Sequence, residues 1–300
     1  MWKGSLDVLI PVFNCADYVS DAVCSILDYN YPSSLAVTVI VVDDFSTDET
    51  AAIVMGLSSR FGEKLKFLRN TNKGKNSAFN LGFASGAGDY VCFMGGDDLI
   101  VPDVLVARVA ALAEAGEAKS ISACKIRTFS AQKKYDGILI PKTKVLGSLS
   151  GGAIMLPRLL LDTIFPLPLS LPNEDSWINF HIKYGGFKVL HVPFVGLNYR
   201  IHGGNSHKRG ISFDDFHRSM SLRWRAIFMY YAKYCDGMEP DVERILLADM
   251  FIELCKMLSL SFPIVVFSLV SVKQRLSALG YSSRFVYALK QKFYGFFVGR

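Results

Sequence analysis

The sequence lacks several features that define well-known classes of protein. It has no run of about 20 uncharged apolar residues, so no segment is expected to span a bilayer. Its six cysteines are scattered, which excludes a zinc site built on close cysteine pairs and a dense disulfide framework. It has neither a Gly-x-Gly-x-x-Gly turn nor a Walker-type phosphate loop. These absences weigh against a membrane channel, a small secreted scaffold, a dehydrogenase and a P-loop nucleotidase.

The composition is that of a folded protein. Of the 300 residues, 51% are hydrophobic and 20% are charged, so the chain can bury a large core and is not intrinsically disordered. The first strand is expected to begin near Leu6, which leaves no room for a signal peptide. We therefore expect a cytoplasmic protein whose cysteines stay reduced.

Basic charge is concentrated in the last third of the chain. The formal net charge is +6, and residues 200–300 contain 15 basic and 8 acidic residues, with no acid after Glu253. If this end is helical, one face carries the apolar residues Phe285, Leu289, Phe293 and Phe296. A basic helix with such a face is typical of in-plane membrane contact. The alternative is an ordinary helical subdomain that packs on the core.

Strand and helix signals alternate over the first hundred residues. Strands are expected over 6–10, 37–42, 65–68 and 90–94, and helices over 16–27, over 77–84 and from near Pro102. Ser46 and Glu49 form a capping-box pattern, which predicts that a further helix starts at Thr47. This order predicts an α/β fold with a mostly parallel sheet flanked by helices. The helical signal near the end predicts a catalytic domain over 1–210 and a helical C-terminal extension over 211–300.

Two acidic pairs follow predicted strands. Asp43 and Asp44 come after the second strand, and Asp97 and Asp98 come after the fourth. In open α/β sheets, ligands bind at the carboxyl ends of the strands. Two neighbouring carboxylates oppose each other's ionisation unless a cation or hydrogen-bond donors intervene, and oxygen donors favour Mg²⁺ or Mn²⁺. A turn that only caps the helix at Pro102 is the alternative.

Four segments in order carry a family resemblance. They are IPVFN, VIVVDDFSTDET, NKGKNSAFNLGFASGAGDYV and FMGGDD. Over residues 6–207 this order resembles the nucleotide-sugar-binding half of the family 2 glycosyltransferases. The resemblance implies a GT-A fold (Rossmann-like) and an inverting, metal-assisted transfer from a nucleoside diphosphate sugar, with UDP as the expected nucleotide. It also implies an acceptor glycan of the bacterial surface-polysaccharide type, such as a lipopolysaccharide precursor on a lipid.

The resemblance assigns roles to individual residues. Pro11, Val12 and Asn14 would shape the nucleotide pocket, and Asp44, or Asp43 in its place, would accept a hydrogen bond from the base. The other contacts to the nucleotide sugar that the resemblance implies come from Asn72, Gly74, Asn80 and Asp97.

The same resemblance implies a metal site. Asp97 matches the last acid of the family's Asp-x-Asp element and would bind Mn²⁺ or Mg²⁺, with Asp98 beside it. Gly95 stands where the family usually has the first acid, so contacts made by that acid are in doubt. His202, in the segment YRIHGGNS, would be a further metal ligand or a diphosphate contact.

A general base is expected in the second half of the chain. Glu174 and Asp175 match the family's Glu-Asp element and precede a helix predicted over 175–184. The resemblance makes Asp175 the base that removes the proton from the acceptor hydroxyl. The alternative for Asp175 is a helix N-cap, and Trp177 either stacks on the acceptor sugar or fills the core.

Two other functions stay open from the sequence. A nucleotidyltransferase that forms the sugar nucleotide would also use strand-end acids and a metal, although its usual Gly-rich basic loop is absent. A catalytically inactive binding subunit would keep the fold alone. The expected partners are the donor, a glycan or polyprenyl-linked acceptor, and the inner face of the plasma membrane as a peripheral surface. Nucleic acid is not expected, because the first two-thirds offer no continuous basic face.

Overall fold

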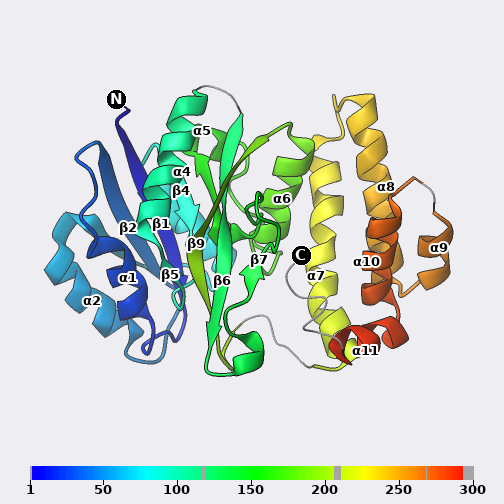
Figure 1. The fold of residues 1–300 in the computed structure, drawn as a ribbon, viewed down its shortest axis with the longest axis horizontal. Coiled ribbons are helices and arrows are strands. Elements are labelled where there is room, and N and C mark those ends of the chain that lie inside the picture. The colour runs from blue at the N-terminus through cyan, green and yellow to red at the C-terminus, as the bar shows by residue number, and fades with distance from the viewer. Residues whose placement is uncertain (1, 117–118, 206–210, 268, 293–300) are drawn as a thin grey trace. The chain divides into compact units, whose positions relative to one another are not determined.

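The computed structural model describes residues 2–116, 119–205, 211–267 and 269–292 (Figure 1). Within them the chain forms two compact units. The first unit contains residues 2–170 and 186–202, and the second contains residues 171–185 and 203–292.

The first unit contains all the strands of the described residues. The strands are β1 Gly4–Val12, β2 Leu35–Asp43, β3 Leu65–Arg69, β4 Tyr90–Phe93, β5 Leu99–Ile100, β6 Ser120–Ser130, β7 Leu139–Ile140, β8 Ile154–Pro157 and β9 Lys188–Ile201. The α-helices are α1 Val19–Leu27, α2 Thr50–Phe61, α3 Lys75–Ser85, α4 Pro102–Ala115 and α5 Arg158–Leu161. Short 3-10 turns are η1 Gly62–Lys64, η2 Lys133–Tyr135 and η3 Gly151–Ala153.

One mixed sheet organises the first unit. Its strands lie in the order β3-β2-β1-β4-β8-β6-β9-β5, and β7 pairs with β6. The strands β3, β2, β1 and β4 are parallel, as the sequence predicted. β8 then runs antiparallel to both β4 and β6, and β9 is parallel to β6. The carboxyl ends of β1, β2 and β4 therefore meet at one edge of the sheet.

Helices cover both faces of the parallel part. On β1, Leu6 and Val8 are both buried, and they belong to one apolar core with α1, α2 and α4. Leu9 points to the opposite face, where Gly82 of α3 packs closely against it and against Ile40. Burial on both faces explains why β1 and β2 read as continuous apolar runs in the sequence.

The predicted start of the second helix is wrong. α2 begins at Thr50 and not at Thr47, and its N-cap residue Glu49 makes no side-chain capping bond. The Ser46 hydroxyl instead accepts a hydrogen bond from the backbone N–H of Asn14 at 3.0 Å. A tertiary contact has therefore taken the oxygen that a capping box would have used.

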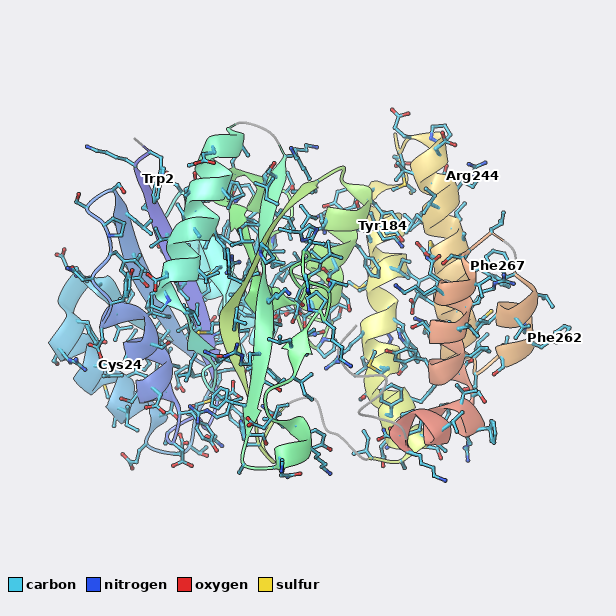
Figure 2. All side chains as sticks on the ribbon, viewed as in Figure 1. Trp2, Cys24, Tyr184, Arg244, Phe262 and Phe267 are labelled. Carbon is cyan, nitrogen blue, oxygen red and sulfur yellow. The ribbon has the colours of Figure 1, made fainter. Side chains whose placement is uncertain are left out.

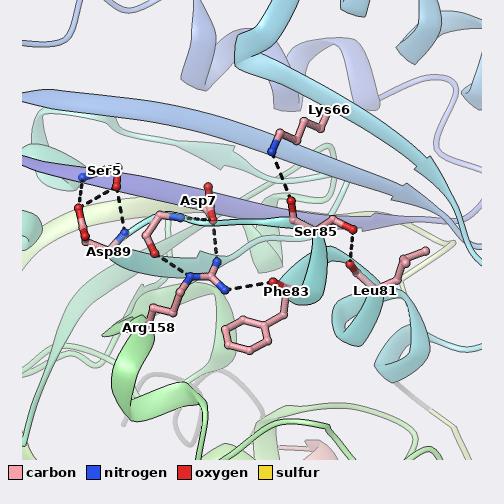
Figure 3. Close-up of polar contacts among 9 residues, drawn as sticks. Ser5, Asp7, Lys66, Leu81, Phe83, Ser85, Asp89 and Arg158 are labelled. Carbon is pink, nitrogen blue, oxygen red and sulfur yellow. Dashed lines mark hydrogen bonds and ion pairs between the residues drawn. The ribbon is translucent and has the colours of Figure 1, made fainter.

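The partly buried guanidinium of Arg158 joins three elements on the α3 face of the sheet (Figure 3). Arg158 Nη2 donates to Asp7 Oδ2 at 2.7 Å, Nε donates to the Gly88 carbonyl at 2.8 Å, and Nη1 donates to the Phe83 carbonyl at 3.1 Å. Asp7 Oδ2 also accepts from the N–H of Gly88 at 2.7 Å. The side chain of Asp7 is only 5% exposed, so this ion pair fixes β1, α3 and the loop before β4 to the start of α5.

The second unit is helical, as the sequence predicted for its end. Its helices are α6 Asp175–Tyr184, α7 Phe213–Tyr234, α8 Pro240–Met257, α9 Ser261–Val266, α10 Val272–Ser282 and α11 Arg284–Lys292. In Figure 1, α9 lies against α8 and α10 on the side away from α7. Phe293 and Phe296, two members of the predicted apolar face, lie outside the described residues. Among the described helices, none combines the length and the apolar character that crossing a membrane requires.

Aromatic side chains hold α6 to α7 within the second unit. Trp177 is 2% exposed, and its ring lies 4.8 Å from His181 and 6.2 Å from Tyr230. His181 Nε2 lies 2.9 Å from the Tyr234 hydroxyl. Trp177 therefore fills the core, which is one of the two roles that the sequence left open.

Candidate functional site

The loops after β1 and β2 interlock at the carboxyl edge of the sheet. Asn14 has a positive φ of 50°, and its Oδ1 accepts from the N–H of Thr47 at 2.8 Å. The N–H of Asp44 donates to the Val12 carbonyl at 2.8 Å. The predicted pocket residue Asn14 thus sets the shape of the loop that carries the first acidic pair.

The two acids of that pair have different environments. Asp43 is 1% exposed, and its Oδ1 accepts from the N–H of Ser46 at 3.2 Å. Asp44 is partly exposed, and its Oδ1 accepts from Asn70 Nδ2 and from the N–H of Gly74, both at 2.8 Å. Gly74 has a φ of 136°, which favours glycine. Asp44 therefore presents its carboxylate at the edge and anchors the loop that precedes α3.

The other residues that were predicted to contact the nucleotide sugar differ in exposure and in their contacts. Pro11 is partly exposed, Val12 is 1% exposed and Asn72 is exposed. Asn80 has its amide engaged in both directions, because its Nδ2 donates to the Leu167 carbonyl at 2.9 Å and its Oδ1 accepts from the Leu167 N–H at 2.7 Å. Asn80 thus holds the loop after α5.

A tight turn follows β4. The N–H of Asp98 donates to the Gly95 carbonyl at 3.4 Å, and this closes the turn. A Cβ atom on Gly95 would lie 2.6 Å from Asp97 Oδ1 and 3.1 Å from Asp98 Oδ2. A Cβ atom on Gly96 would lie 2.6 Å from the side chain of Val12. A side chain at position 95 would therefore displace the Asp97 carboxylate from the position that it has here.

Asp98 is a buried acid. It is 4% exposed, and its Oδ1 accepts from the backbone N–H of Arg200 at 2.9 Å. Burial, followed by the negative charge of neighbouring Asp97, raises the pKa of Asp98 well above its usual value. Asp98 therefore joins the turn to the end of β9.

Asp97 and His202 meet at the surface of the edge. Asp97 Oδ2 lies 2.9 Å from His202 Nε2, and their side chains are 21% and 23% exposed. The His202 ring packs against Tyr18 with a centroid separation of 4.7 Å. Two of the three predicted metal ligands are thus in direct contact and accessible.

Arg200 organises this corner through contacts that were not predicted from the sequence. Its Nε donates to the Asp97 carbonyl at 2.8 Å, and Nη2 lies 3.3 Å from Asp21 Oδ2. The guanidinium lies between the rings of Tyr18 and Phe129, at 4.8 Å and 4.6 Å from their centroids. The segment YRIH indicated that this strand end matters, but contacts of Arg200 with residues more than 100 positions away cannot be predicted from the residues around it.

The side chains at this corner fit a divalent ion only with help from other ligands. No group of three or more His, Cys, Asp or Glu side chains in the described part of the chain is arranged to hold a metal by itself. Asp97 Oδ2 and His202 Nε2 are 2.9 Å apart, which is about the separation of adjacent ligands at ~2.1 Å in an octahedron. Mg²⁺ and Mn²⁺ sites often use one or two protein ligands and take the rest from water and phosphates. The pair therefore fits an ion that a diphosphate would complete.

The Cys15 thiol lies near this corner but does not supply a nucleophile. Burial raises the pKa of Cys15 to about 11, and Asp97 and Asp48 add to this effect. The thiolate is the reactive form of cysteine, so covalent catalysis by Cys15 is disfavoured at neutral pH.

The predicted base belongs to the second unit. Asp175 is the first residue of α6, and its Oδ2 accepts from Asn173 Nδ2 at 2.9 Å. Glu174, which is 3% exposed, is the N-cap residue of the helix. Asp175 therefore does not have the N-cap role that was its alternative.

Comparison with known proteins identifies the fold and the family. Residues 7–158, about half of the chain, match the sequence profile described as "Glycosyl transferase family 2". An uncharacterized glycosyltransferase of Nostoc is 33% identical over 100 residues, which are 33% of this chain and 30% of that protein. One from Rickettsia prowazekii is 26% identical over 227 residues, which are 69% of this chain and 67% of that protein. The chain spans less than half the length of the first curated relatives that it matches.

Solved structures show the same fold. The crystal structure of S. aureus TarS 1-349 in complex with UDP-GlcNAc is 19% identical, with a TM-score of 0.61 over 93% of this chain and 80% of that one. The complex of the same protein with UDP gives a TM-score of 0.59 at 18% identity, over 95% of this chain and 83% of that one. The GT-A fold predicted from the sequence is confirmed. Together with the profile match, these findings show that the chain belongs to glycosyl transferase family 2.

Proposed function

We propose that this protein transfers a sugar from a UDP-linked donor to a hydroxyl of an acceptor glycan, with inversion at the anomeric carbon. The observation that carries the proposal is the single sheet edge of the first unit that gathers Asp44, Asp97 and His202. A nucleotide-sugar donor is supported by TarS, which shares the fold and was crystallised with UDP and with UDP-GlcNAc.

The donor base is proposed to bind at Asp44. Both of its oxygens accept hydrogen bonds from Gly74, and a carboxylate oxygen can accept a second bond from a base N–H such as that of uracil. Pro11, Val12 and Asn14 are proposed to form the wall beside it. Asn72 is exposed on the loop that Asp44 anchors, so it can reach the nucleotide sugar directly. Asn80 contributes indirectly, through the loop at Leu167.

The diphosphate is proposed to lie at Asp97 and His202. These two side chains would hold Mn²⁺ or Mg²⁺, which supplies positive charge to the departing diphosphate when it is bound. Asp98 supports them from below, because it fixes the turn to the backbone of Arg200.

Asp175 is proposed as the general base. It would take the proton of the acceptor O–H while that oxygen attacks the anomeric carbon, and the bond from this carbon to the diphosphate oxygen breaks with its electron pair leaving on UDP. Attack from the face opposite the diphosphate inverts the configuration. A carboxylate in the first turn of α6 is stabilised by the helix dipole, and Glu174 lies beside it.

The acceptor is proposed to be a polyprenyl-linked oligosaccharide in surface polysaccharide synthesis. The support is the basic and aromatic-rich last third of the chain, which suits work at the inner face of a plasma membrane as a peripheral protein.

A ligand screen tests the proposal. Thermal unfolding is followed with UDP, GDP and dTDP, each with Mn²⁺, because a ligand of the folded state raises the unfolding temperature. UDP should give the largest rise, Asp97→Asn should remove the Mn²⁺-dependent part, and Asp175→Asn should keep the rise but lose transfer. No response to any diphosphate would overturn the proposal. Pyrophosphate release from a nucleoside triphosphate would indicate a nucleotidyltransferase, and UDP-sugar binding without transfer to any acceptor would indicate an inactive subunit.

A further inference from the structure

The second unit exposes a group of apolar side chains around α9. They come from one continuous stretch of chain, are 58–76% exposed, and are called the α9 patch: Leu258, Phe262, Val266, Leu269, Val272 and Leu276. Figure 2 shows Phe262 on the outer side of α9. Large apolar side chains grouped on a folded surface mark a contact site for a protein or a membrane.

The α9 patch is presented by a packed segment. Beneath it, Ile264 is fully buried and Val270 is 8% exposed, in a core shared with α8 and α10. Arg275 Nη1 donates to the Val265 carbonyl at 2.7 Å. A capping box at Ser271 starts α10. The outward direction of the patch is therefore fixed by the fold.

The stretch of chain that carries the α9 patch, residues 258–276, has basic side chains and no acidic ones. No Asp or Glu follows Glu253 in the sequence. The last two acids of α8 are each held by a lysine, Asp249 by Lys183 and Glu253 by Lys256, with side chains only 13% and 18% exposed. Lys273, at the start of α10, is exposed. The surroundings of the patch therefore suit a negatively charged partner.

We infer that the α9 patch is the surface through which this protein docks on an anionic lipid bilayer. Apolar side chains can enter the boundary between headgroups and acyl chains while basic side chains stay with the anionic headgroups. α9 has six residues, which is far too short to cross a bilayer and suits shallow insertion. A second copy of the chain would bring the same positive surroundings, so charge opposes self-association here. The inference rests on the proposed membrane location and names the contact surface; it does not depend on sugar transfer.

Vesicle sedimentation with the full chain tests the inference. Phosphatidylcholine vesicles with phosphatidylglycerol should bind the protein, and vesicles of phosphatidylcholine alone should bind it more weakly. Phe262→Gln and Leu269→Gln should each lower the partition coefficient about tenfold, since each removes one large apolar group from the contact. Phe194→Gln is the matched control, because Phe194 is 64% exposed on β9 of the first unit. It should bind as the unmodified chain does.

Three results would overturn the inference. In the first, Phe262→Gln and Leu269→Gln bind vesicles as the unmodified chain does. In the second, Phe285→Gln alone releases the protein, which would place the anchor on α11, where Phe285 is 78% exposed. In the third, light scattering shows that the unmodified chain is a dimer and that Phe262→Gln is a monomer. The UDP-induced rise in unfolding temperature should be the same in Phe262→Gln, so loss of lipid binding with UDP binding intact separates this inference from the proposed function.

Discussion

Acidification is expected to destabilise the helical unit that carries Asp175, because His181 is buried there without charge. Its side chain is 4% exposed, and its ring nitrogens lie 2.8 Å from the Trp177 carbonyl and 2.9 Å from the Tyr234 hydroxyl. Burial lowers the pKa of His181 from 6.5 to about 4, and the positive charge of Lys233 adds to this effect. The neutral ring with hydrogen on Nδ1 satisfies both contacts, since Nδ1–H donates to the carbonyl and Nε2 accepts from the hydroxyl.

The sign and size of the effect follow from the two pKa values. In the unfolded chain His181 takes up a proton near pH 6.5, whereas in the folded unit it does so only near pH 4. The contribution of His181 to the free energy of unfolding is therefore fully present above pH 6.5 and is lost as the pH falls towards 4. Each tenfold change in proton affinity is worth about 1.4 kcal/mol, so the total loss is about 3 kcal/mol.

The measurement compares urea unfolding of the unmodified chain and of His181→Gln between pH 7 and pH 4. The variant cannot titrate at this position, and its amide can still accept from Tyr234. Buried acids such as Glu253, whose pKa is raised by burial, titrate in both proteins and cancel in the difference. Equal losses in the two proteins would refute the reasoning. If the variant does not fold, NMR titration of His181 in the unmodified chain decides, and a midpoint above pH 6 contradicts the prediction.

Three further predictions concern the first unit. Asp7→Ala should lower the free energy of unfolding by about 1.5–3 kcal/mol, because it removes the carboxylate partner of the Arg158 guanidinium, and adding Arg158→Met should restore part of the loss; hydrogen exchange of the β1 amides measures both. Arg108→Met should raise the free energy of unfolding by about 1 kcal/mol or more, because Arg108 is 1% exposed, its Nε makes a long 3.4 Å hydrogen bond to the Ser122 hydroxyl, and its Nη2 has no hydrogen-bond partner among the described residues; a loss of stability on urea unfolding would contradict this. Gly95→Ala should displace Asp97 and abolish the Mn²⁺-dependent response to UDP, whereas Gly56→Ala, which meets no atom within 4 Å, should keep it; an unchanged response in Gly95→Ala would show that the turn can yield.

The parallel half of the fold could be predicted because its signals are local. Continuous apolar runs marked β1 and β2, and the acids that follow β2 and β4 lie at the predicted edge because parallel strands end together. The helix over Asp175–Tyr184 has the predicted bounds.

The rest depends on contacts between distant residues. The capping box at Ser46 had the right pattern, but Asn14, 32 positions away, takes the hydroxyl. Asp98 is held by the backbone N–H of Arg200, 102 positions away, and its burial was not predicted from the sequence. The antiparallel position of β8 between β4 and β6 also has no marker in its own four residues.

The path of the chain between its two units limits how the protein can be taken apart. α6 belongs to the helical unit, yet the chain returns to the sheet for β9 before it enters the helical unit again. A fragment that stops after β9 would keep α6 without α7, and would leave the indole of Trp177 in water without Tyr230. The helical part is therefore not a detachable module that recombination could exchange with a single crossover, and trimming it for expression should yield insoluble protein.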